Sequence, residues 1–329
     1  MNLGEASRPR RSFSMLISEL GGELALIDRL RRPSRNPKVL VGIGDDAAVV
    51  MCGGELLAVT TDLLVEGDHF SLDYFSPHQV GWKAMESNLS DLAAVGAEPR
   101  YALVGLTLRS DSSVELVEGI YDGLYASADR CGVEVIGGDT THGEVLVLAI
   151  TLFGEVGRED LHLRSSARPG DRILVSGPLG GSAAGLALLK AGVEGFEGVK
   201  RRHLEPTAKI ELSKSLRGKV HAMEDVSDGL ASEVRNICLA SGCGAVIFAD
   251  SVPVDPEVRE AADLLGLDPL DWALFGGEDF ELVYTVPEGV GVPGYEVGRI
   301  TEGDGIYLEG KEERRPLSEW GYDHFRPTP

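Results

Sequence analysis

A chain of 329 residues, 43% of them hydrophobic, is long enough to bury a core, and we predict two globular domains. Its formal net charge of −22 argues against nucleic acid as a partner, because a phosphate backbone is bound by a basic surface. The charge does not exclude a phosphate substrate, which carboxylates hold through bridging Mg²⁺. The four cysteines, Cys52, Cys131, Cys238 and Cys243, form no zinc or disulfide pattern, which indicates a reducing cytoplasm.

The first 32 residues are expected to form one or two amphipathic helices. Arg10 and Arg11 resemble a twin-arginine export signal, but acidic residues interrupt the apolar stretch that such a signal requires. The longest apolar run, Val145–Phe153, is too short to span a membrane, so we expect no membrane partner. The apolar face of the helices would consist of Phe13, Leu16, Ile17, Leu20 and Leu24.

Acidic residues follow short apolar strands between residues 39 and 70. The predicted strands Val39–Ile43 and Ala47–Met51 flank the pair Asp45 and Asp46. A third apolar run, Leu56–Val59, ends in Thr60, Thr61 and Asp62. Carboxylates at strand ends lie at the rim of a sheet, where metal and ligand have access, and hard oxygen ligands suit Mg²⁺.

The elements that follow alternate between helix and strand. The expected order is a helix over 77–97, a strand over 101–108, a helix over 114–128 closed by Gly132, and strands over 133–136 and 145–156. Asn88 and Asp91 fall on the apolar side of the first helix, which indicates a functional site or a capping network. The polar segment 164–171 marks the domain boundary, so we predict two α/β (α+β) domains over residues 1–160 and 161–329.

The second half begins with a predicted strand over 171–176, a Gly-rich turn and a helix over 182–190 with Ser182 as its N-cap. A glycine turn between strand and helix binds phosphate in some folds and permits close packing in others. This turn lacks the spacing of the known phosphate loops. Further helices are expected over 206–216 and 230–240, and strands over 222–225, 245–249 and 279–286.

Acidic residues recur beside glycine, serine or threonine at strand ends and first helical turns. Each one alone could be a cap or a turn residue. Together they indicate several divalent ions and a polyphosphate, because crowded carboxylates without cations would destabilise one another. Arg164 could reach a phosphate or lie on the surface, and His69 could touch substrate or be structural, whereas Lys83 and the segment 201–203 are typical of surface. The acidic set is Asp45, Asp46, Asp62, Asp91, Asp139, Asp225, Asp228 and Glu278.

These motifs resemble the thiamine-monophosphate kinase family, within the aminoimidazole ribonucleotide synthetase-like superfamily. The matching stretches run in the family's order from about Gly42 to Phe325, and residues 1–10 lie outside them. They include GIGDDAAVV, TTDLLVEGDHF, WKAMESNLSDLAAVGAEP, VIGGDTT, LRSSARPGD, DVSDGLASEV, FGGEDFELVYTVP and GYDHF.

The resemblance implies a two-domain α/β enzyme that transfers the γ-phosphate of ATP to thiamine monophosphate with several Mg²⁺ ions, and a homodimer formed through the first domain. Carried onto this sequence, it implies three sets of residues. Magnesium would be held by Asp46, Thr60, Thr61, Asp62, Asp91, Asp139, Asp225 and Asp228. ATP would meet Asp46, Tyr121, Gly138, Asp139, Arg164 and Ser227, and the thiamine end would meet His69, Glu278 and Tyr322.

The chemistry of such a reaction needs no catalytic base in the chain. A phosphate monoester is largely ionised at neutral pH, since its second pKa is about 6. Catalysis would therefore consist of positioning and electrostatics. Two alternatives stay open: another ATP-using member of the superfamily, such as a cyclo-ligase, and a non-catalytic acidic metal-binding protein.

Overall fold

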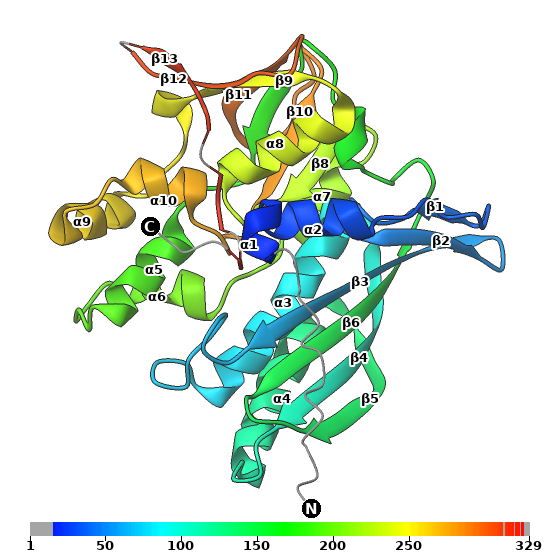
Figure 1. The fold of residues 1–329 in the computed structure, drawn as a ribbon, viewed down its shortest axis with the longest axis vertical. Helices are drawn as coiled ribbons and strands as arrows, with labels where there is room; N and C mark the ends of the chain where they lie inside the picture. The colour runs from blue at the N-terminus through cyan, green and yellow to red at the C-terminus, as the bar shows by residue number, and fades with distance from the viewer. Residues whose placement is uncertain (1–15, 312, 319, 323, 326–329) are drawn as a thin grey trace, which may run out of the picture.

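The computed structural model describes residues 16–311, 313–318, 320–322 and 324–325. Within them the chain builds two β-sheets with helices packed on each, one below the other in Figure 1. The first sheet draws its strands from residues 39–156 and the second from residues 172–316. This mixed architecture confirms the predicted α/β fold class. The twin-arginine stretch and Phe13 lie outside the described residues, and the domain boundary at 160 stays a prediction.

Two short helices, α1 (Ile17–Leu20) and α2 (Glu23–Leu30), precede the first sheet. They occupy the part of the chain where one or two helices were expected. Their predicted apolar face is not a core face, because Leu16 and Leu24 are 63% and 44% exposed. In the described part of the chain, no helix is both long and apolar enough to cross a bilayer.

The first sheet has the order β1-β2-β3-β6-β4-β5 among the described residues. Its neighbours are antiparallel except β4 and β5, which are parallel. β3 continues to Val65 rather than ending before Thr60, because its ladder with β6 pairs residues 56–65. The strands are β1 (Val39–Val41), β2 (Ala48–Cys52), β3 (Glu55–Val65), β4 (Glu98–Leu108), β5 (Glu134–His142) and β6 (Val147–Val156).

Helix α3 (Pro77–Ala94) is largely buried, because both halves of the molecule pack on it. It contacts β3 and β6 of the first sheet, and also α7 and β8 of the second half. Its first turn is fixed by Ser76, whose hydroxyl accepts from the Gln79 N–H. Leu89 and Leu92 of α3 join Met223 and Tyr284 of the second sheet in one hydrophobic core.

Helix α4 (Val114–Cys131) lies directly against α3, and the two backbones nearly touch. A Cβ added to Gly81 would lie 1.8 Å from the Ile120 carbonyl oxygen, and one added to Gly123 would lie 1.8 Å from that of His78. Glycine at these crossing points allows the close approach. Gly132 ends α4 with a φ of 68°, as predicted.

The second sheet has the order β13-β12-β9-β11-β7-β10-β8 among the described residues, so β8 lies at the edge beside α3. Its strands are β7 (Arg172–Val175), β8 (Ala222–Asp225), β9 (Gly244–Phe248), β10 (Leu282–Val286), β11 (Tyr295–Thr301), β12 (Ile306–Glu309) and β13 (Arg314–Pro316). The helices around it are α5 (Gly181–Lys190), α6 (Glu197–Leu204), α7 (Ile210–Leu216), α8 (Leu230–Ser241), α9 (Pro256–Leu265) and α10 (Pro269–Phe275), with short 3₁₀ turns η1 (Arg164–Ser166) and η2 (Ala249–Ser251).

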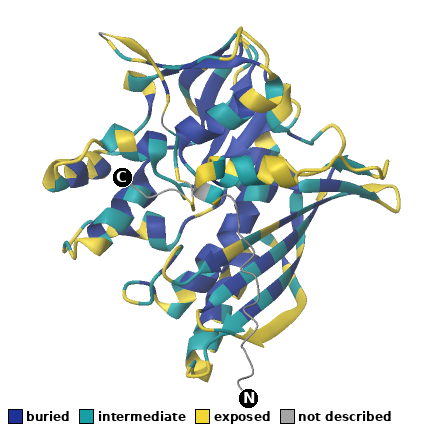
Figure 2. Cartoon of the chain, viewed as in Figure 1, coloured by how far each residue is buried: buried dark blue, intermediate teal, exposed yellow. Residues whose placement is uncertain are grey.

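Burial is uneven across the first sheet. Figure 2 shows buried residues concentrated between the two sheets and an exposed strand, β5, along one edge. Along β3 the even-numbered positions 56, 58, 60 and 64 are buried, whereas the odd positions are half-buried or exposed. The face of this sheet opposite α3 is therefore only partly covered.

Candidate active site

Strand β3 and helix α3 meet through polar side chains. The Thr60 hydroxyl donates to Asp91 Oδ2 at 2.5 Å, and the Asp62 N–H donates to Asn88 Oδ1 at 3.1 Å. Ser87 hydrogen-bonds the Asp62 carboxylate. Thr60 and Asp62 share one face of β3 because strand side chains alternate, and this face points to α3. The polar residues on the apolar side of α3 therefore hold the acidic part of β3 in place.

Three carboxylates from distant segments converge beside this contact. Asp46 precedes β2, Asp91 lies on α3, and Asp225 is the last residue of β8. One oxygen of each lies within 4.8 Å of the others. The Ser90 hydroxyl donates to Asp225 Oδ2 at 2.6 Å, which ties the second sheet to α3. We call Asp46, Asp62, Asp91 and Asp225 the carboxylate cluster.

The carboxylate cluster is electrostatically strained. Burial, and then the neighbouring charges of Asp62, Asp225 and Asp46, raise the pKa of Asp91 well above its ordinary value. Burial and the charge of Asp46 likewise raise the pKa of Asp225. Burial raises the pKa of Asp62 as well. Carboxylates whose charges oppose one another in this way are stabilised by a bound cation.

Arg164 supplies one cation to this region. Its Nη2 lies 2.5 Å from Asp46 Oδ1 and 2.8 Å from Glu224 Oε1. The backbone of Arg164 is held in place by α8, because the Ser241 hydroxyl donates to the Arg164 carbonyl at 2.8 Å. Asp45 accepts from the backbone N–H of Arg164 at 3.3 Å, so it orders the loop rather than joining the carboxylate cluster.

The donor set fits Mg²⁺. Asp46 Oδ2 and Glu224 Oε2 are buried and have no hydrogen-bond partner among the described residues. Buried polar atoms are normally satisfied, so these two oxygens point to a missing partner. The groups that converge are all hard oxygen donors, which Mg²⁺ prefers over softer metals.

A second group of polar residues surrounds Glu278, at the end of α3 that is far from Asp91. Lys83 Nζ lies 2.6 Å from Glu278 Oε1 and donates to the His69 carbonyl at 3.0 Å. His203 Nδ1 lies 3.4 Å from Glu278 Oε2. Lys83 and His203 are 1% and 2% exposed, so the expectation that both are surface residues is wrong.

Glu278 has an unusual backbone. Its φ is +64°, a value that residues other than glycine seldom adopt. The conformation is held by the Glu278 N–H, which donates to the Ser227 carbonyl at 2.7 Å. A Cβ on Gly277 would lie 2.2 Å from that same carbonyl. Strained backbone conformations of this kind cluster at active sites and ligand-binding sites, which supports a functional role for Glu278.

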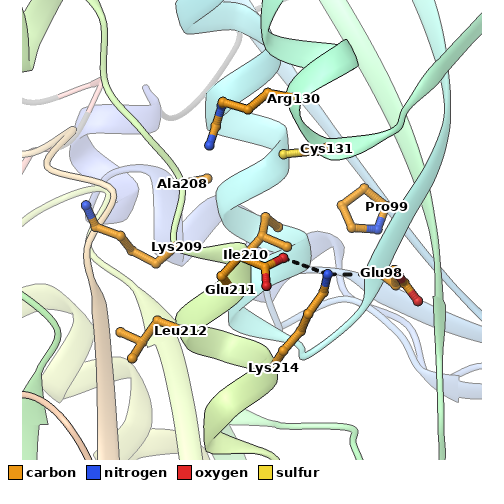
Figure 3. Close-up of a pocket in the computed structure, with 10 residues that line it drawn as sticks. All are labelled: Glu98, Pro99, Arg130, Cys131, Ala208, Lys209, Ile210, Glu211, Leu212 and Lys214. Carbon is orange, nitrogen blue, oxygen red and sulfur yellow. Dashed lines mark hydrogen bonds and ion pairs between the residues drawn. The ribbon is translucent and has the colours of Figure 1, made fainter.

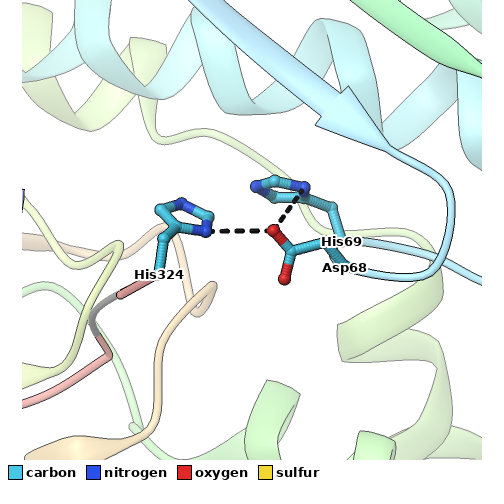
Figure 4. A group of neighbouring side chains, drawn as sticks. All are labelled: Asp68, His69 and His324. Atoms are coloured by element: carbon cyan, nitrogen blue, oxygen red, sulfur yellow. Dashed lines mark hydrogen bonds and ion pairs between the residues drawn. The ribbon is translucent and has the colours of Figure 1, made fainter. Parts of the chain in front are cut away.

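The described residues 320–322 and 324–325, which we call the C-terminal segment, contact the loop after β3 beside this second group. Tyr322 donates its hydroxyl to Asp68 Oδ1 at 2.7 Å, and its N–H to the Asp228 carbonyl at 3.3 Å. His324 Nδ1 lies 3.0 Å from Asp68 Oδ2, and Figure 4 shows the neighbouring rings of His69 and His324 both facing that carboxylate. The loop after β3 and the C-terminal segment therefore meet around Asp68.

Four of the predicted site residues lie apart from these two groups. Thr61 faces the other side of β3 and bonds the Ile150 carbonyl at 2.9 Å. Gly138 and Asp139 are exposed on the edge strand β5, and Tyr121 lies half-buried on α4 with its ring 5.8 Å from that of Tyr125. Their roles stay predictions. The other predicted residues belong to one of the two groups.

The Gly-rich turn before α5 is occupied by the protein itself. Asp279 accepts from the backbone N–H groups of Gly180 and Ser182 at 2.6 and 3.0 Å. The N-cap is Gly180 rather than the predicted Ser182. Of the two interpretations left open by the sequence, close packing is favoured, because a carboxylate already fills the helix N-terminus.

A pocket of about 360 Å³ lies away from the carboxylate cluster, between the start of β4, the end of α4 and α7 (Figure 3). Three cations, Arg130, Lys209 and Lys214, line it. Each is already paired with a carboxylate, at 2.5, 2.9 and 2.7 Å respectively. The pocket therefore offers no unpaired positive charge to an anionic ligand.

Several residues of the site were not predicted. Ser87 and Ser90 follow Lys83 at i+4 and i+7, so the periodicity of α3 could have placed Lys83 on the side of these two site residues. Glu224 immediately precedes Asp225 in β8. Neighbouring residues of a strand face opposite sides, so the pattern gave no reason to expect Glu224 to pair with Arg164. Glu233 accepts a hydrogen bond from the Asp228 N–H at 2.7 Å, and it was missed because an acidic residue in the first turn of a helix such as α8 is common.

Comparison with known proteins defines the class. Residues 44–156 match the family model "AIR synthase related protein, N-terminal domain", and residues 168–311 match its C-terminal domain. The chain is 37% identical to the thiamine-monophosphate kinase of Aquifex aeolicus, over 94% of this chain and 100% of the relative. It is 38% identical to that of Escherichia coli K12, over 92% and 98%.

Solved structures agree with the sequence relatives. The structure described as "AaThiL complexed with AMPPCP and TMP" superposes with a TM-score of 0.86 at 36% identity, covering 95% of this chain and all of that one. A hydrogenase maturation protein, HypE, matches with a TM-score of 0.70 at 24% identity, which shows only a shared fold. The chain belongs to the thiamine-monophosphate kinase family, and it is an enzyme.

Proposed function

We propose that this enzyme transfers the γ-phosphate of ATP directly to thiamine monophosphate, giving thiamine diphosphate and ADP. The observation that carries the proposal is the pairing of two groups along α3. One is a carboxylate cluster with an unsatisfied oxygen on Asp46, and the other is the aimed carboxylate of Glu278 beside Tyr322. The relatives named thiamine-monophosphate kinase, and the similar structure described with AMPPCP and TMP, support the choice of substrates.

The residues of the two groups would have different roles in the reaction. Asp46, Asp91 and Asp225, with Asp62 and Thr60, would hold magnesium, which when bound neutralises the phosphates of both substrates. Arg164 already points its guanidinium into the cluster and is placed to meet a phosphate there. The backbone carbonyls of Ser227 and Asp228 belong to the second group, since they accept hydrogen bonds from the N–H groups of Glu278 and Tyr322. Catalysis is therefore positioning and charge, with no side chain acting as a base.

The second group, around Glu278, would bind the thiamine part of the acceptor, which is a cationic heterocycle; we call it the acceptor end. Glu278 presents a carboxylate that Lys83 and His203 hold from behind, and this group would lie beside the positively charged ring of thiamine. Tyr322, 42% exposed, offers an aromatic face from the C-terminal segment, and His69 lies across Asp68 from it.

An assay of products tests the proposal. Purified enzyme incubated with ATP, Mg²⁺ and thiamine monophosphate should yield thiamine diphosphate and ADP in equal amounts. Chromatography measures both products. EDTA should stop turnover, and added Mg²⁺ should restore it. Orthophosphate in place of thiamine diphosphate would instead point to the cyclo-ligase type of chemistry and contradict the proposal.

Replacing Tyr322 by alanine should raise the KM for thiamine monophosphate roughly tenfold and leave the KM for ATP nearly unchanged, because an aromatic contact of about 1–1.5 kcal/mol is lost. Steady-state kinetics with each substrate varied in turn measures this. Tyr322→Phe keeps the ring and should show a smaller effect. Tyr295→Ala, at an exposed tyrosine of β11, is the matched control. A change confined to ATP would refute the placement.

We also propose that the enzyme is a homodimer formed through the partly covered face of the first sheet. Leu63 and Tyr101 are 54% and 46% exposed there, and monomeric proteins seldom leave such a face to water. Light scattering after gel filtration should give twice the mass of one chain. Leu63→Glu should yield monomers, whereas Leu264→Glu, at an equally exposed leucine of α9, should not. A monomeric wild-type enzyme would exclude this arrangement.

A further inference from the structure

The loop after β3 and the C-terminal segment bring two imidazoles to one carboxylate. A single ligand atom from each of Asp68, His69 and His324 lies within 4.8 Å of the other two (Figure 4). Asp68 Oδ2 is 3.0 Å from His324 Nδ1 and 3.9 Å from His69 Nδ1. His69 also belongs to the acceptor end proposed above, but the proposed phosphoryl transfer requires neither Asp68 nor His324. We call these three residues the His–Asp cluster.

The spacing suits a small transition ion. Ligand atoms bound tetrahedrally to Zn²⁺ at about 2.0–2.1 Å lie about 3.3 Å from one another. The two distances to Asp68 Oδ2 bracket that value, so small side-chain rotations would complete the site. His69 Nδ1 now accepts a long bond of 3.2 Å from the Val65 N–H, which ligation through this nitrogen would replace.

The surroundings orient the carboxylate. Tyr322 donates to Asp68 Oδ1 at 2.7 Å, so that oxygen is taken and Oδ2 is left facing the two histidines. Such a hydrogen bond behind a ligand is the usual support of protein metal sites. Two imidazoles with one carboxylate favour zinc-like ions over magnesium, in contrast to the all-oxygen carboxylate cluster.

We propose that the His–Asp cluster is a binding site for one zinc-class divalent ion, which would fasten the C-terminal segment to the loop after β3. Three protein ligands leave a fourth position open to water or to a ligand. Because Tyr322 lies two residues from His324, an ion bound here would fix Tyr322 in place. Resting on the proposed function, the ion would take up His69, a residue of the acceptor end, and would therefore be an inhibitor competitive with thiamine monophosphate.

Zinc binding to the full-length enzyme tests this without any substrate. The protein competes with a chromophoric chelator for added Zn²⁺, and the absorbance of the chelator reports how much Zn²⁺ the protein takes. Millimolar Mg²⁺ is present throughout to occupy the carboxylate cluster. The variant His324→Gln keeps a hydrogen-bonding group beside Asp68 but loses the imidazole. His142→Gln, at an exposed histidine of β5, is the matched control, and the free cysteine Cys52 is present in all three proteins.

Wild type and His142→Gln should each bind one more equivalent of Zn²⁺ than His324→Gln, or bind it at least about tenfold more tightly. Even the loss of a residue that hydrogen-bonds a metal ligand lowers metal affinity about 10–100-fold. Equal binding by all three proteins, or an equal loss in His142→Gln, would overturn the proposal. Circular dichroism shows whether His324→Gln is folded, and Asp68→Asn provides a second loss of ligand. Because binding is measured without ATP or acceptor, its failure is separate from any failure of the kinase assay.

Discussion

Replacing Asp91 by asparagine should reduce turnover at least about 10²-fold while making the metal-free protein more stable. The loss arises because a charged group that holds the reacting phosphates through magnesium is removed, and one such preorganised contact is worth about 2.7–4 kcal/mol. The gain arises because Asp91 is crowded by Asp62, Asp225 and Asp46, whose charges oppose its own. Relief of that repulsion should raise the free energy of unfolding of the metal-free protein.

Both effects can be measured on the same preparation. Initial rates at saturating ATP and Mg²⁺ give the loss of activity, and urea unfolding in EDTA gives the change in stability. The amide oxygen of the introduced asparagine can still accept from the Thr60 hydroxyl, so the fold should persist. Asp263→Asn, at an exposed position of α9, should change neither quantity. A variant that is both less stable and active would show that Asp91 is structural.

Replacing Glu278 by glutamine should destabilise the fold more than replacing its partner Lys83 by methionine. The two side chains form one ion pair, but Lys83 is 1% exposed and Glu278 is 29% exposed. Glu278→Gln leaves a buried ammonium without its counter-charge, for which we expect about 3–5 kcal/mol. Lys83→Met leaves a carboxylate that water can reach, for which about 1–3 kcal/mol is expected.

Urea unfolding of the two single variants and the double variant distinguishes the pair from other effects. The double variant should be more stable than Glu278→Gln alone, because no buried charge remains. The strained φ of +64° is common to all three proteins and cancels in the comparison. Equal losses from the two single changes would mean that burial of Lys83 does not control the energetics. Both single variants should also weaken acceptor binding, since Lys83 aims Glu278.

The sequence predicted those parts of the fold that depend on local pattern. Helix α3 and its polar inward face could be expected from periodicity, and β8 was predicted with its observed bounds. The end of β3 could not, because Thr60, Thr61 and Asp62 are polar and only the ladder with β6 keeps them in the strand. Long-range pairing decides such boundaries.

The site shows the same division. The acidic motifs indicated the carboxylate cluster, since glycine and hydroxyl residues accompany each carboxylate. Lys83 was misjudged because lysine is seldom buried, and its partner Glu278 lies far along the chain. Gly138 and Asp139 are exposed on β5, apart from the carboxylate cluster, and their contact with ATP stays a prediction.

Helix α3 also sets a fixed distance between the two groups of the site. Positions 83 and 91 are separated by about 12 Å along a helix axis, and they anchor the acceptor group and the carboxylate cluster respectively. A rigid spacing between the two would select an acceptor by its length as well as its charge, so that one phosphate too few or too many would miss the reacting position. Inserting a residue between 84 and 90 would turn one end by about 100° relative to the other. This stretch can therefore change by substitution but not in length.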